Sequence, residues 1–449
     1  MSRKNKFRFL TFIIIFFISF IACFAEDKDK SFESINLETI NQNVKEQGSQ
    51  LSDGSLKLTL KKALDIAMQN NRSVKEAIST LPVSEASLII AKYFPNPTFG
   101  ANTEFVKQGS IHPGQLGQNF ELNRARHWRI TIAKEQISKT ELEIAKVLWE
   151  VHTQVHIGYS ALSTGLAQFN LAKARADFYK SLLDIAQKKS QAGDISQLEL
   201  NRAKMEYVVA QNDLDEAEKK LKRAKIDFNH LLGTDDLHEE VITTSIEELK
   251  PKIKVNEYQP LEKVLEEASS KRLEFAILEK EFGITRAQLK KAKWERIPVL
   301  YIEGGPARPN YHDNIWGPYF GTQFELPIFN RRQGEIKQAK AQIEHLEKQR
   351  ERLKQDISAE ATNALQDLEL SEKQVFRFLD QLLNQSQDIL EKIKEGYKGG
   401  KLSLTDVLNA EQRNRDLNQD YLNSLFNYQY SLASLEYAVG VPLYGLSEQ

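Results

Sequence analysis

Cysteine is almost absent from this chain of 449 residues, in which Cys23 is the only one. A single cysteine excludes an internal disulfide and a cluster of thiolate metal ligands. An excess of charge of either sign is also missing, because 61 Lys and Arg residues are balanced by 62 Asp and Glu residues. The formal net charge of −1 gives no reason to expect nucleic acid as a partner.

Proline and glycine are scarce, with 12 and 21 residues, and they are clustered. Between the clusters, residues that favour helices dominate the chain after residue 56, which predicts long helices with few interruptions. Beyond the N-terminus, the chain lacks the run of about 18 apolar residues that a membrane helix needs. Helices are therefore not expected to cross a membrane.

The N-terminus, residues 1–25, has the pattern of an export signal. The basic segment MSRKNKFR precedes the apolar run FLTFIIIFFISFIA, which is short for a membrane span. Two processing sites fit this pattern. Ordinary cleavage would follow Ala25, whereas lipoprotein processing would make Cys23 the acylated first residue, although the usual Leu is missing from FIAC. Both alternatives predict export from the cytoplasm.

Long proline-free stretches follow a polar lead-in. Residues 26–56 are rich in Ser, Asn, Gln and Glu and predict an extended segment. Residues 124–191 and 331–398 contain no proline, and each predicts one very long helix. Apolar residues from Leu148 to Leu183 recur with heptad spacing, which is typical of supercoiled helices. Further helices are predicted over residues 59–94 with a kink at Pro82, over residues 196–232, from about residue 261, and up to about residue 439.

The second half of the chain repeats the order of the first. Alternating apolar residues between glycines and prolines predict β-hairpins at about residues 97–122 and 298–327. Three residue pairs share one offset along the chain: Gly193 and Gly400, Ser196 and Ser403, and Glu199 and Asp406. This pattern indicates an internal duplication, with repeat 1 over residues 57–250, repeat 2 over residues 251–442 and a tail over residues 443–449.

The two predicted hairpins cannot close a membrane structure within one chain. Strand edges in a membrane must be paired, and known single-chain barrels begin at about eight strands. The predicted fold is therefore mainly α with a small β part, a trimeric membrane β-barrel of about 12 strands continued by a long α-helical barrel. Such an assembly would be a passive conduit. A periplasmic coiled-coil adaptor or scaffold without a pore is the alternative, which leaves the hairpins unexplained.

A break in the helical sequence precedes the last helix of each repeat. Gly399 and Gly400 end the second long helix and Gly193 ends the first, so both reversals are expected at one end of the tube. Asp406 lies just inside the returning helix, where symmetry would place its copies in an acidic ring that selects cations. It is equally a favourable acid in the first turn of a helix. The sequence leaves both alternatives open.

Motifs for enzymes and metal sites are missing. His152 and His156 have the spacing of two metal ligands, but no third ligand is near, so a solvated or packing role and no metal site are expected. No Gly-x-Ser-x-Gly motif or catalytic Cys–His pair occurs, so neither an enzyme nor a cofactor is predicted. Four aromatic residues are either interfacial or ordinary loop packing: Tyr311, Trp316, Tyr319 and Phe320.

Three motifs resemble the TolC-type outer-membrane efflux proteins, and the resemblance covers nearly all of the mature sequence. They are LTLKKALDIAMQNN, FELPIFNRRQGEIKQAKAQIE and YKGGKLSLTDVLNAEQRNRDLNQDYLNSLFNYQYSLASLEYAVGVPL, of which the last is quite specific. The resemblance implies a homotrimeric channel in outer-membrane lipid, with a long periplasmic helical barrel. It also implies two partners, a periplasmic adaptor (membrane fusion) protein and an inner-membrane RND-type pump. An outer-membrane channel of a tripartite efflux system, gated at its periplasmic end, is therefore predicted.

The resemblance also assigns gate residues. Asp406 matches an entrance aspartate of the family, whereas the second family aspartate is replaced by Asn409. Tyr397 matches a gate tyrosine, and Glu199 matches the acid that this tyrosine contacts in the closed state. Leu402 stands where the family has a gate arginine, so that lock is absent.

The segments ELPIFNRRQGEI, PNPTFGANTEF and FELNRARHWRI look most like the heavy-metal, CzcC-like branch of the family. This likeness implies heavy-metal cations as substrates. The sequence itself names neither the substrate nor the pump.

Overall fold

The computed structural model describes residues 56–103, 111–237, 241–243, 246–251, 260–308, 315–381 and 383–441. These residues form two compact units. Unit 1 contains the described residues of Met1–Lys75, Val147–Arg272 and Asp356–Gln449, and unit 2 contains those of Glu76–Lys146 and Leu273–Gln355. Cys23 and the predicted export signal lie outside the described residues.

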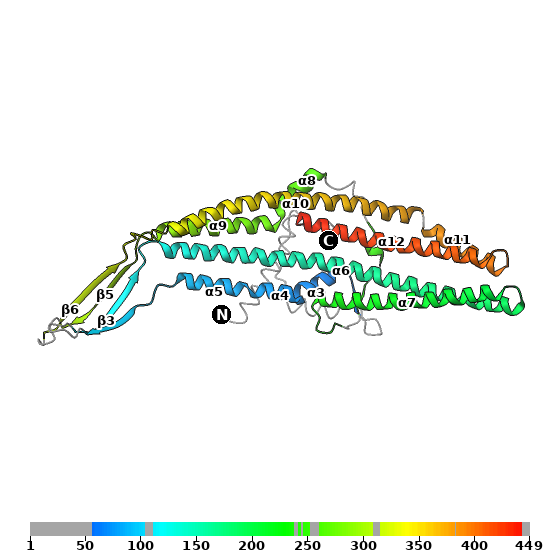
Figure 1. The fold of residues 1–449 in the computed structure, drawn as a ribbon, viewed down its shortest axis with the longest axis horizontal. Helices are drawn as coiled ribbons and strands as arrows, with labels where there is room; N and C mark the ends of the chain where they lie inside the picture. The colour runs from blue at the N-terminus through cyan, green and yellow to red at the C-terminus, as the bar shows by residue number, and fades with distance from the viewer. Residues whose placement is uncertain are drawn as a thin grey trace, which may run out of the picture. The chain divides into compact units, whose positions relative to one another are not determined.

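Unit 2 contains both predicted hairpins. Their strands are β2 (Thr98–Thr103), β3 (Ile111–Phe120), β5 (Leu300–Ala307) and β6 (Gly317–Phe324). The strands form one antiparallel sheet in the order β2-β3-β5-β6, so β3 and β5 join the two hairpins (Figure 1). Within the described residues, β2 and β6 each have one neighbouring strand and one open edge.

The helices of unit 2 pack through a small apolar core. They are α5 (Leu81–Lys92), α9 (Leu273–Trp294) and the first parts of α6 (Ala125–Ala192) and α10 (Gln333–Gln381). Leu278 and Phe282 of α9 contact Leu346 of α10 in this core. Ile343 and Leu353 of α10 pack against the same cluster, so the contact is a narrow apolar stripe between two otherwise charged helices.

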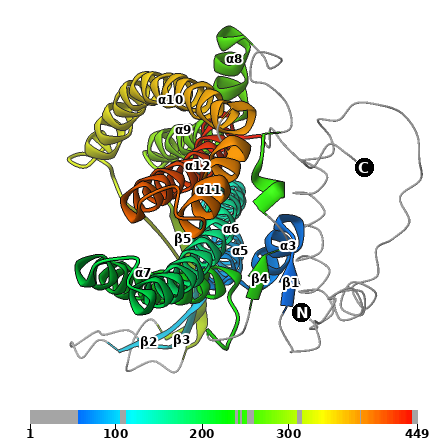
Figure 2. The ribbon, with the colours of Figure 1, turned by 90° about the vertical axis from the view of Figure 1, so that its right-hand side faces the viewer.

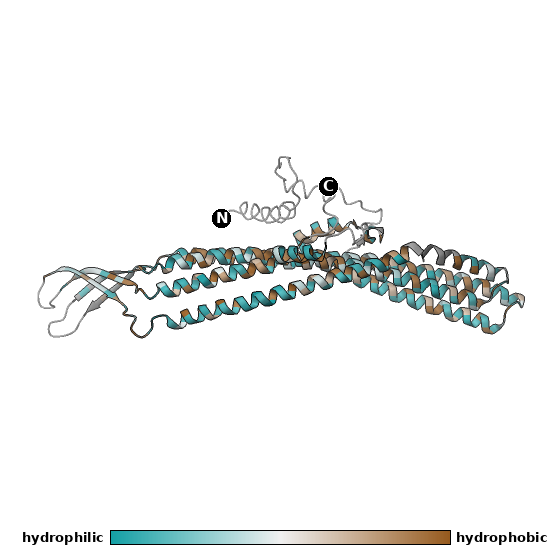
Figure 3. Cartoon of the chain, turned by 90° about the horizontal axis from the view of Figure 1, so that it is seen from above, coloured by the Kyte–Doolittle hydropathy of each residue, from teal (hydrophilic) through white to brown (hydrophobic). Residues whose placement is uncertain are grey.

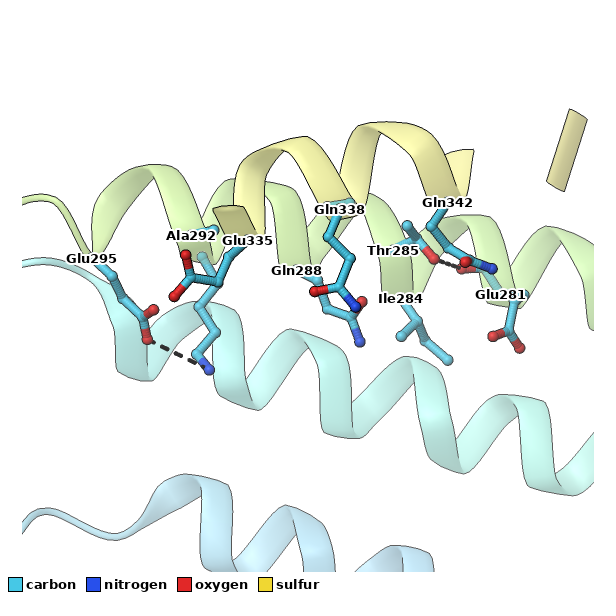
Figure 4. A pocket seen from close by; sticks show the side chains of 11 residues that line it. Glu281, Ile284, Thr285, Gln288, Ala292, Glu295, Glu335, Gln338 and Gln342 are labelled. Atoms are coloured by element: carbon cyan, nitrogen blue, oxygen red, sulfur yellow. Dashed lines mark hydrogen bonds and ion pairs between the residues drawn. The ribbon is translucent and has the colours of Figure 1, made fainter. Parts of the chain in front are cut away.

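A groove of about 490 Å³ lies between α9 and the start of α10 (Figure 4). Amide and carboxyl side chains from both helices line it, among them Gln288, Gln338 and Glu335. Small-molecule sites are usually lined mainly by apolar and aromatic side chains. This groove is therefore an unusual place for an apolar ligand, and it carries no part of the candidate site.

Unit 1 consists of packed helices with a short strand pair beside them (Figures 1 and 2). Besides the remaining parts of α6 and α10 and the start of α4 (Arg72–Ser79), its helices are α3 (Leu60–Asn70), α7 (Gln197–Leu232), α8 (Leu261–Lys271), α11 (Leu383–Lys398) and α12 (Leu404–Val439). β1 (Leu56–Leu58) pairs in parallel with β4 (Val241–Thr243), which precedes the 3-10 helix η1 (Ile246–Leu249).

The heptad row of α6 packs into the core of unit 1 as predicted. Leu148, Val155 and Leu162 are buried. Gly158 lies so close to α7 that a Cβ atom there would be 2.7 Å from Cδ1 of Leu231. The small residue therefore allows the two antiparallel helices to approach closely.

Hydrophobic residues follow stripes along the helices and alternate with hydrophilic ones (Figure 3). Such stripes are typical of helices that are buried on one side. In the ranges that the structure describes, no helix is both long and apolar enough to cross a membrane.

Residues 59–94 do not form the single kinked helix that the sequence predicts. The chain breaks at Asn71, whose Oδ1 accepts a hydrogen bond from the backbone N of Ser73 at 2.9 Å and so caps α4. The Asn71 Nδ2 donates to the carbonyl of Leu231 at 2.7 Å. Pro82 lies in the first turn of α5, where its missing N–H costs no helical hydrogen bond. Pro82 therefore starts a helix and does not kink one.

Both halves of the chain end their last helix in the same way. Gly233 after α7 and Gly440 after α12 have φ angles of 72° and 82°. A Cβ atom on Gly233 would be 2.3 Å from the carbonyl oxygen of Asn70, and one on Gly440 would be 3.3 Å from that of Lys271. Each glycine thus packs on the last residue of α3 or α8. The shared contact supports the internal duplication, whose boundaries stay a prediction.

Candidate functional site

Two tight turns lie at the same end of unit 1 (Figures 1 and 2). Gly193, between α6 and α7, has a φ of 81°, and Gly400, between α11 and α12, has a φ of 73°. This left-handed backbone favours glycine. No atom lies within 4 Å of a Cβ built on either residue, so the backbone conformation and not crowding requires glycine here. The backbone N of Gly399 donates to the carbonyl of Glu395 at 2.9 Å and closes the last turn of α11.

Asp406 forms a capping box with Ser403 at the start of α12. The Asp406 Oδ2 accepts hydrogen bonds from the Ser403 backbone N at 2.9 Å and from the Ser403 Oγ at 2.7 Å, while Ser403 Oγ accepts from the Asp406 N at 3.2 Å. These bonds, the side-chain one first, lower the pKa of Asp406. The residue is exposed at the turn. Asp406 is therefore both a capping acid and a surface charge, and Oδ1 takes part in neither hydrogen bond from Ser403.

In the matching turn after α6, Ser196 caps α7 as Ser403 caps α12, but of these two turns only the one with Ser403 and Asp406 has the full capping box. The backbone N of Glu199 donates to the Oγ of Ser196 at 3.2 Å, as the Asp406 N does to Ser403. The Glu199 side chain is half-buried. Asn409 is exposed one turn after Asp406 in α12, where a second acid is expected from the family pattern. The described turns therefore carry Asp406 as the exposed helix-capping acid.

Tyr397 is part of the apolar core beneath the turns. It is 2% exposed and packs in a cluster that includes Leu182, Leu200 and Leu404. Burial raises the pKa of Tyr397, and the negative charge of nearby Glu199 adds to the effect. The Tyr397 hydroxyl has no hydrogen-bond partner among the described residues, so Glu199 lies near the ring without accepting its proton. The role of both residues in a gate remains a proposal.

One further contact connects the two turns, and another lies within the second turn. Arg202 of α7 donates through Nη1 to the Oγ1 of Thr405 in α12 at 3.2 Å. Leu402 packs on Gly396, where a Cβ atom would be 2.7 Å from the Leu402 Cδ1. The residue that replaces the family arginine thus makes an apolar contact within its own turn, and Arg202 supplies a polar link between the two helix pairs.

A buried ionic cluster lies farther along the same helices. The Arg175 Nε is 3.1 Å from Oε1 of Glu411, and its Nη1 pairs with Asp213. The Tyr179 hydroxyl donates to the Glu411 Oε2 at 2.5 Å, and burial together with this bond raises the pKa of Tyr179. The cluster joins α6, α7 and α12. Sequence patterns do not single it out, because acids and bases occur throughout these charged helices.

The histidine pair of α6 lies in the core of unit 1 and not at the turns. His156 is hydrogen-bonded on both ring nitrogens, to Glu436 at 3.3 Å and to Gln429 at 2.9 Å. His152 stacks on Trp149 with a centroid distance of 4.9 Å. No group of three possible metal ligands occurs among the described residues. The described contacts of the two rings are hydrogen bonds for His156 and ring stacking for His152.

The aromatic residues near the second hairpin separate onto different surfaces. Phe320 of β6 is 81% exposed, and Trp316 is exposed just before the strand. Tyr319 hydrogen-bonds to Glu303 on β5. Tyr311 lies outside the described residues. Of the described residues in this set, Tyr319 and Phe320 lie on opposite faces of β6.

The sequence matches a known family in two segments. Residues 63–234 and 309–441 match the family described as outer membrane efflux protein. This chain belongs to that family. Each matched segment includes one of the two turns, so the similarity that the motifs predict is confirmed on both halves of the chain.

Alignments with two named relatives cover most of this chain. It is 22% identical to the cobalt-zinc-cadmium resistance protein CzcC of Cupriavidus metallidurans over 356 residues, which is 79% of this chain and 83% of that protein. It is 21% identical to the outer membrane protein TolC of Escherichia coli over 361 residues, covering 73% and 68% of the two chains. The CmeC outer membrane channel of Campylobacter jejuni has a similar structure, with a TM-score of 0.71 at 17% identity over 94% of this chain and 95% of that one.

The chain is therefore the outer-membrane channel component of an efflux system, with a long periplasmic extension. Its fold is that of the outer-membrane efflux channels, in which a membrane β-barrel continues into a helical barrel. Channels of this family are trimers that work with adaptor and inner-membrane pump partners. Because its relatives are channels, the alternative of an adaptor or scaffold without a pore is set aside.

Proposed function

We propose that three copies of this chain form a channel whose periplasmic gate is built from the turns at Gly193 and Gly400. A periplasmic adaptor and an inner-membrane RND-type pump would deliver its substrate. The open edges of β2 and β6 support closure by further copies, because unpaired strand edges are unstable in a membrane. The helix-turn-helix pairs of one chain also meet at one end of unit 1, which supports a single gate region.

The exposed carboxylate of Asp406 carries the proposal that the gate selects cations. An aspartate is charged at neutral pH even at its ordinary pKa, which is lowered further here, and threefold symmetry would repeat the charge around one axis. Rings of carboxylates favour cations over anions in channels. With Asn409 in place of a second acid, one such ring is proposed. The similarity to a cobalt-zinc-cadmium resistance protein favours heavy-metal cations as the cargo.

Single-channel currents of the purified protein in a planar bilayer test this proposal under a KCl gradient. We expect a cation-selective current that divalent cations block from the side of the turns. Asp406→Asn retains an oxygen that can accept from Ser403 but removes the charge, so selectivity and block should weaken. Ser403→Ala removes the cap and retains the charge, so selectivity should persist while the helix start loses about 1 kcal/mol.

The two variants separate the charge of Asp406 from its capping role. Unchanged selectivity in Asp406→Asn would reduce Asp406 to a capping acid. Absence of current in wild type and in variants with disrupted turns, from well-folded trimers, would contradict the gated channel.

The cargo is tested in cells that normally contain the protein. Deleting the chain should lower tolerance to cobalt, zinc and cadmium salts more than tolerance to organic antibiotics. Complementation with Asp406→Asn should restore tolerance less well than wild type at equal amounts in the outer membrane. Equal loss of tolerance to both classes of compound would argue against heavy-metal specificity.

A further inference from the structure

The membrane sheet of unit 2 has two faces of different chemistry. Strand pairing places Leu300, Ile302 and their partners on one face, and Tyr301 and Glu303 on the other. The first face is mainly apolar, although Gln118 and Thr322 also lie on it. Its large exposed side chains are Phe99, Leu116, Phe120, Phe320 and Phe324. In outer-membrane barrels, the lipid face is apolar and the interior is polar. The face that carries Glu303 is therefore the interior face.

Glu303 is the sole carboxylate in the described strands β2, β3, β5 and β6, which contain no Lys or Arg. Arg308 is the first base along the chain after Glu303, and it follows the end of β5. His112 is the other ionisable side chain besides the tyrosines, and its ring packs edge-on to Tyr319 at a centroid distance of 4.7 Å. The strand part of the interior face therefore carries a net negative charge at neutral pH.

The position of this carboxylate is fixed by neighbours on the same face. The Tyr319 hydroxyl donates to Oε1 of Glu303 at 3.0 Å. Gly321 lies beneath the pair: a Cβ atom there would be 2.5 Å from the Tyr319 hydroxyl and 3.0 Å from the Glu303 Oε1. Glycine therefore allows both side chains to lie against the sheet, which keeps the carboxylate at the wall of the barrel.

A second tyrosine uses the same arrangement on the neighbouring strands. A Cβ atom on Gly117 would be 1.9 Å from the Tyr301 hydroxyl, which is 2.9 Å from the Oγ1 of Thr98. The interior face thus has hydroxyl groups that lie flat on glycines, with one charged group among them. Low-dielectric walls concentrate the field of such a fixed charge in the pore.

We propose that Glu303, positioned by Tyr319, is a cation-selecting residue in the membrane part of the channel, distinct from the turn acid Asp406. Threefold assembly would place three such carboxylates around the pore, where they favour hydrated cations and disfavour anions. The inference rests on the trimeric channel of the proposed function, but it requires neither the gate nor a metal cargo.

Reversal potentials in a planar bilayer under a KCl gradient test the role of Glu303. Glu303→Gln keeps the shape of the side chain and can still accept from Tyr319, so the ratio of cation to anion permeability should fall several-fold. Glu303→Gln combined with Gln323→Glu moves the charge to a neighbouring position on the same face, so selectivity should return. Tyr319→Phe keeps the charge but frees it, so selectivity should fall less than in Glu303→Gln.

A cysteine at the same position tests the charge without relying on the folding of a glutamine variant. Cys23 is the one native cysteine, so Glu303→Cys adds a thiol that can be modified in the assembled channel. If Cys23 is present in the purified protein, the variant is made in a Cys23→Ser background. A negatively charged methanethiosulfonate should raise cation selectivity, and a positively charged one should lower or reverse it. An unchanged reversal potential with both reagents, once labelling is confirmed, would overturn the proposal.

Comparison with Asp406→Asn separates this inference from the gate proposal. Loss of selectivity in Glu303→Gln alone supports the barrel residue and contradicts the turn ring. Loss in Asp406→Asn alone supports the turn ring and overturns the role of Glu303.

Discussion

Lys189 binds Tyr397 in two ways. Its ammonium donates to the carbonyl oxygen of Tyr397 at 2.6 Å and lies 4.5 Å from the centroid of the same ring. Carbonyl groups at the end of a helix lack partners in the helix and carry a partial negative charge. The same carbonyl also accepts from the backbone N of Gly400 at 3.0 Å, so Lys189, in the last turn of α6, adds a second hydrogen bond at the end of α11 and fastens the two turns together.

Lys189→Met should loosen this end of the protein. The variant keeps the apolar stem on the Tyr397 ring but loses the hydrogen bond to the helix end, so we expect a higher open probability without added divalent cations. Lys188→Met is the matched control, because Lys188 is exposed on the neighbouring position. Equal open probabilities in the two variants, measured as single-channel current, would show that Lys189 does not hold the gate.

The ring of Tyr397, and not its hydroxyl, should hold the turns closed. The sequence predicts that Tyr397→Phe with Glu199→Gln raises the resting conductance. Since the hydroxyl has no partner in the described residues, Tyr397→Phe alone should leave the resting conductance unchanged. Tyr397→Ala removes a buried ring, costs about 3–5 kcal/mol by analogy with other aromatic truncations, and should raise the conductance. A clear rise in Tyr397→Phe would mean that the hydroxyl finds Glu199 in the trimer.

Glu411 should contribute more to stability than Asp213, although both pair with Arg175. The Glu411 carboxylate is buried, whereas the Asp213 side chain is 42% exposed. Breaking a buried ion pair leaves an uncompensated charge, so Glu411→Gln should cost up to about 3 kcal/mol. An exposed pair contributes about 0–1 kcal/mol, which is expected for Asp213→Asn. Denaturant unfolding in detergent compares the variants, and equal costs would contradict this ranking.

The contacts of His156 give the protein a pH-dependent contribution to stability. Burial favours the neutral ring, but the hydrogen bond and charge of Glu436 and the hydrogen bond of Gln429 outweigh it, so the pKa of His156 is raised above 6.5. A raised pKa in the folded state means that this stabilisation is fully present below about pH 6.5. It is lost as the pH rises through the pKa of the folded state.

His156→Gln should therefore lower the apparent melting temperature more at about pH 6 than at about pH 9. His152→Gln provides a control of opposite sign. Burial lowers the pKa of His152, so this residue destabilises the wild-type protein increasingly as the pH falls. Relative to wild type, the melting temperature of His152→Gln should therefore be higher at low pH than at high pH. Differences from wild type that do not change with pH would show that His156 stays neutral.

Gly233 should tolerate alanine less well than Gly400. Both have positive φ angles, which cost a residue with a side chain about 1–2 kcal/mol. At Gly233 the new methyl group would also meet the Asn70 carbonyl at 2.3 Å, whereas nothing lies within 4 Å at Gly400. The apparent melting temperature should thus fall further in Gly233→Ala than in Gly400→Ala. A larger loss at Gly400 would mean that its turn is buried in the assembled protein.

Elements with local signals were predictable from the sequence, and breaks imposed by distant contacts were not. The absence of proline predicts α6, and Gly399 and Gly400 predict the break before α12. The breaks at Asn71 and Arg272 have neither proline nor glycine. Asn71 caps α4 locally, and both breaks also make hydrogen bonds to carbonyl groups far along the chain, from Asn71 to Leu231 and from Arg272 to Tyr437.

The candidate site was predictable in position but not in its contacts. The repeated glycine and serine residues locate both turns, because each type has a direct backbone role. The burial of Tyr397 and the pairing of Lys189 with its carbonyl depend on how four helices meet. The proposed role of Glu303 could not be predicted from neighbouring residues in the sequence either, because it depends on the face of the sheet on which strand pairing places the side chain.

The open edges of β2 and β6 have a consequence for mixtures of subunits. The two edges differ, and a ring of identical copies joins β6 of each copy to β2 of the next until the last copy meets the first. A copy with prolines in β6 could still be captured through β2, but it would offer the following copy no edge to join. Such a subunit would prevent ring closure in every assembly that includes it. In a cell that also makes the normal chain, the loss of channels would therefore be genetically dominant.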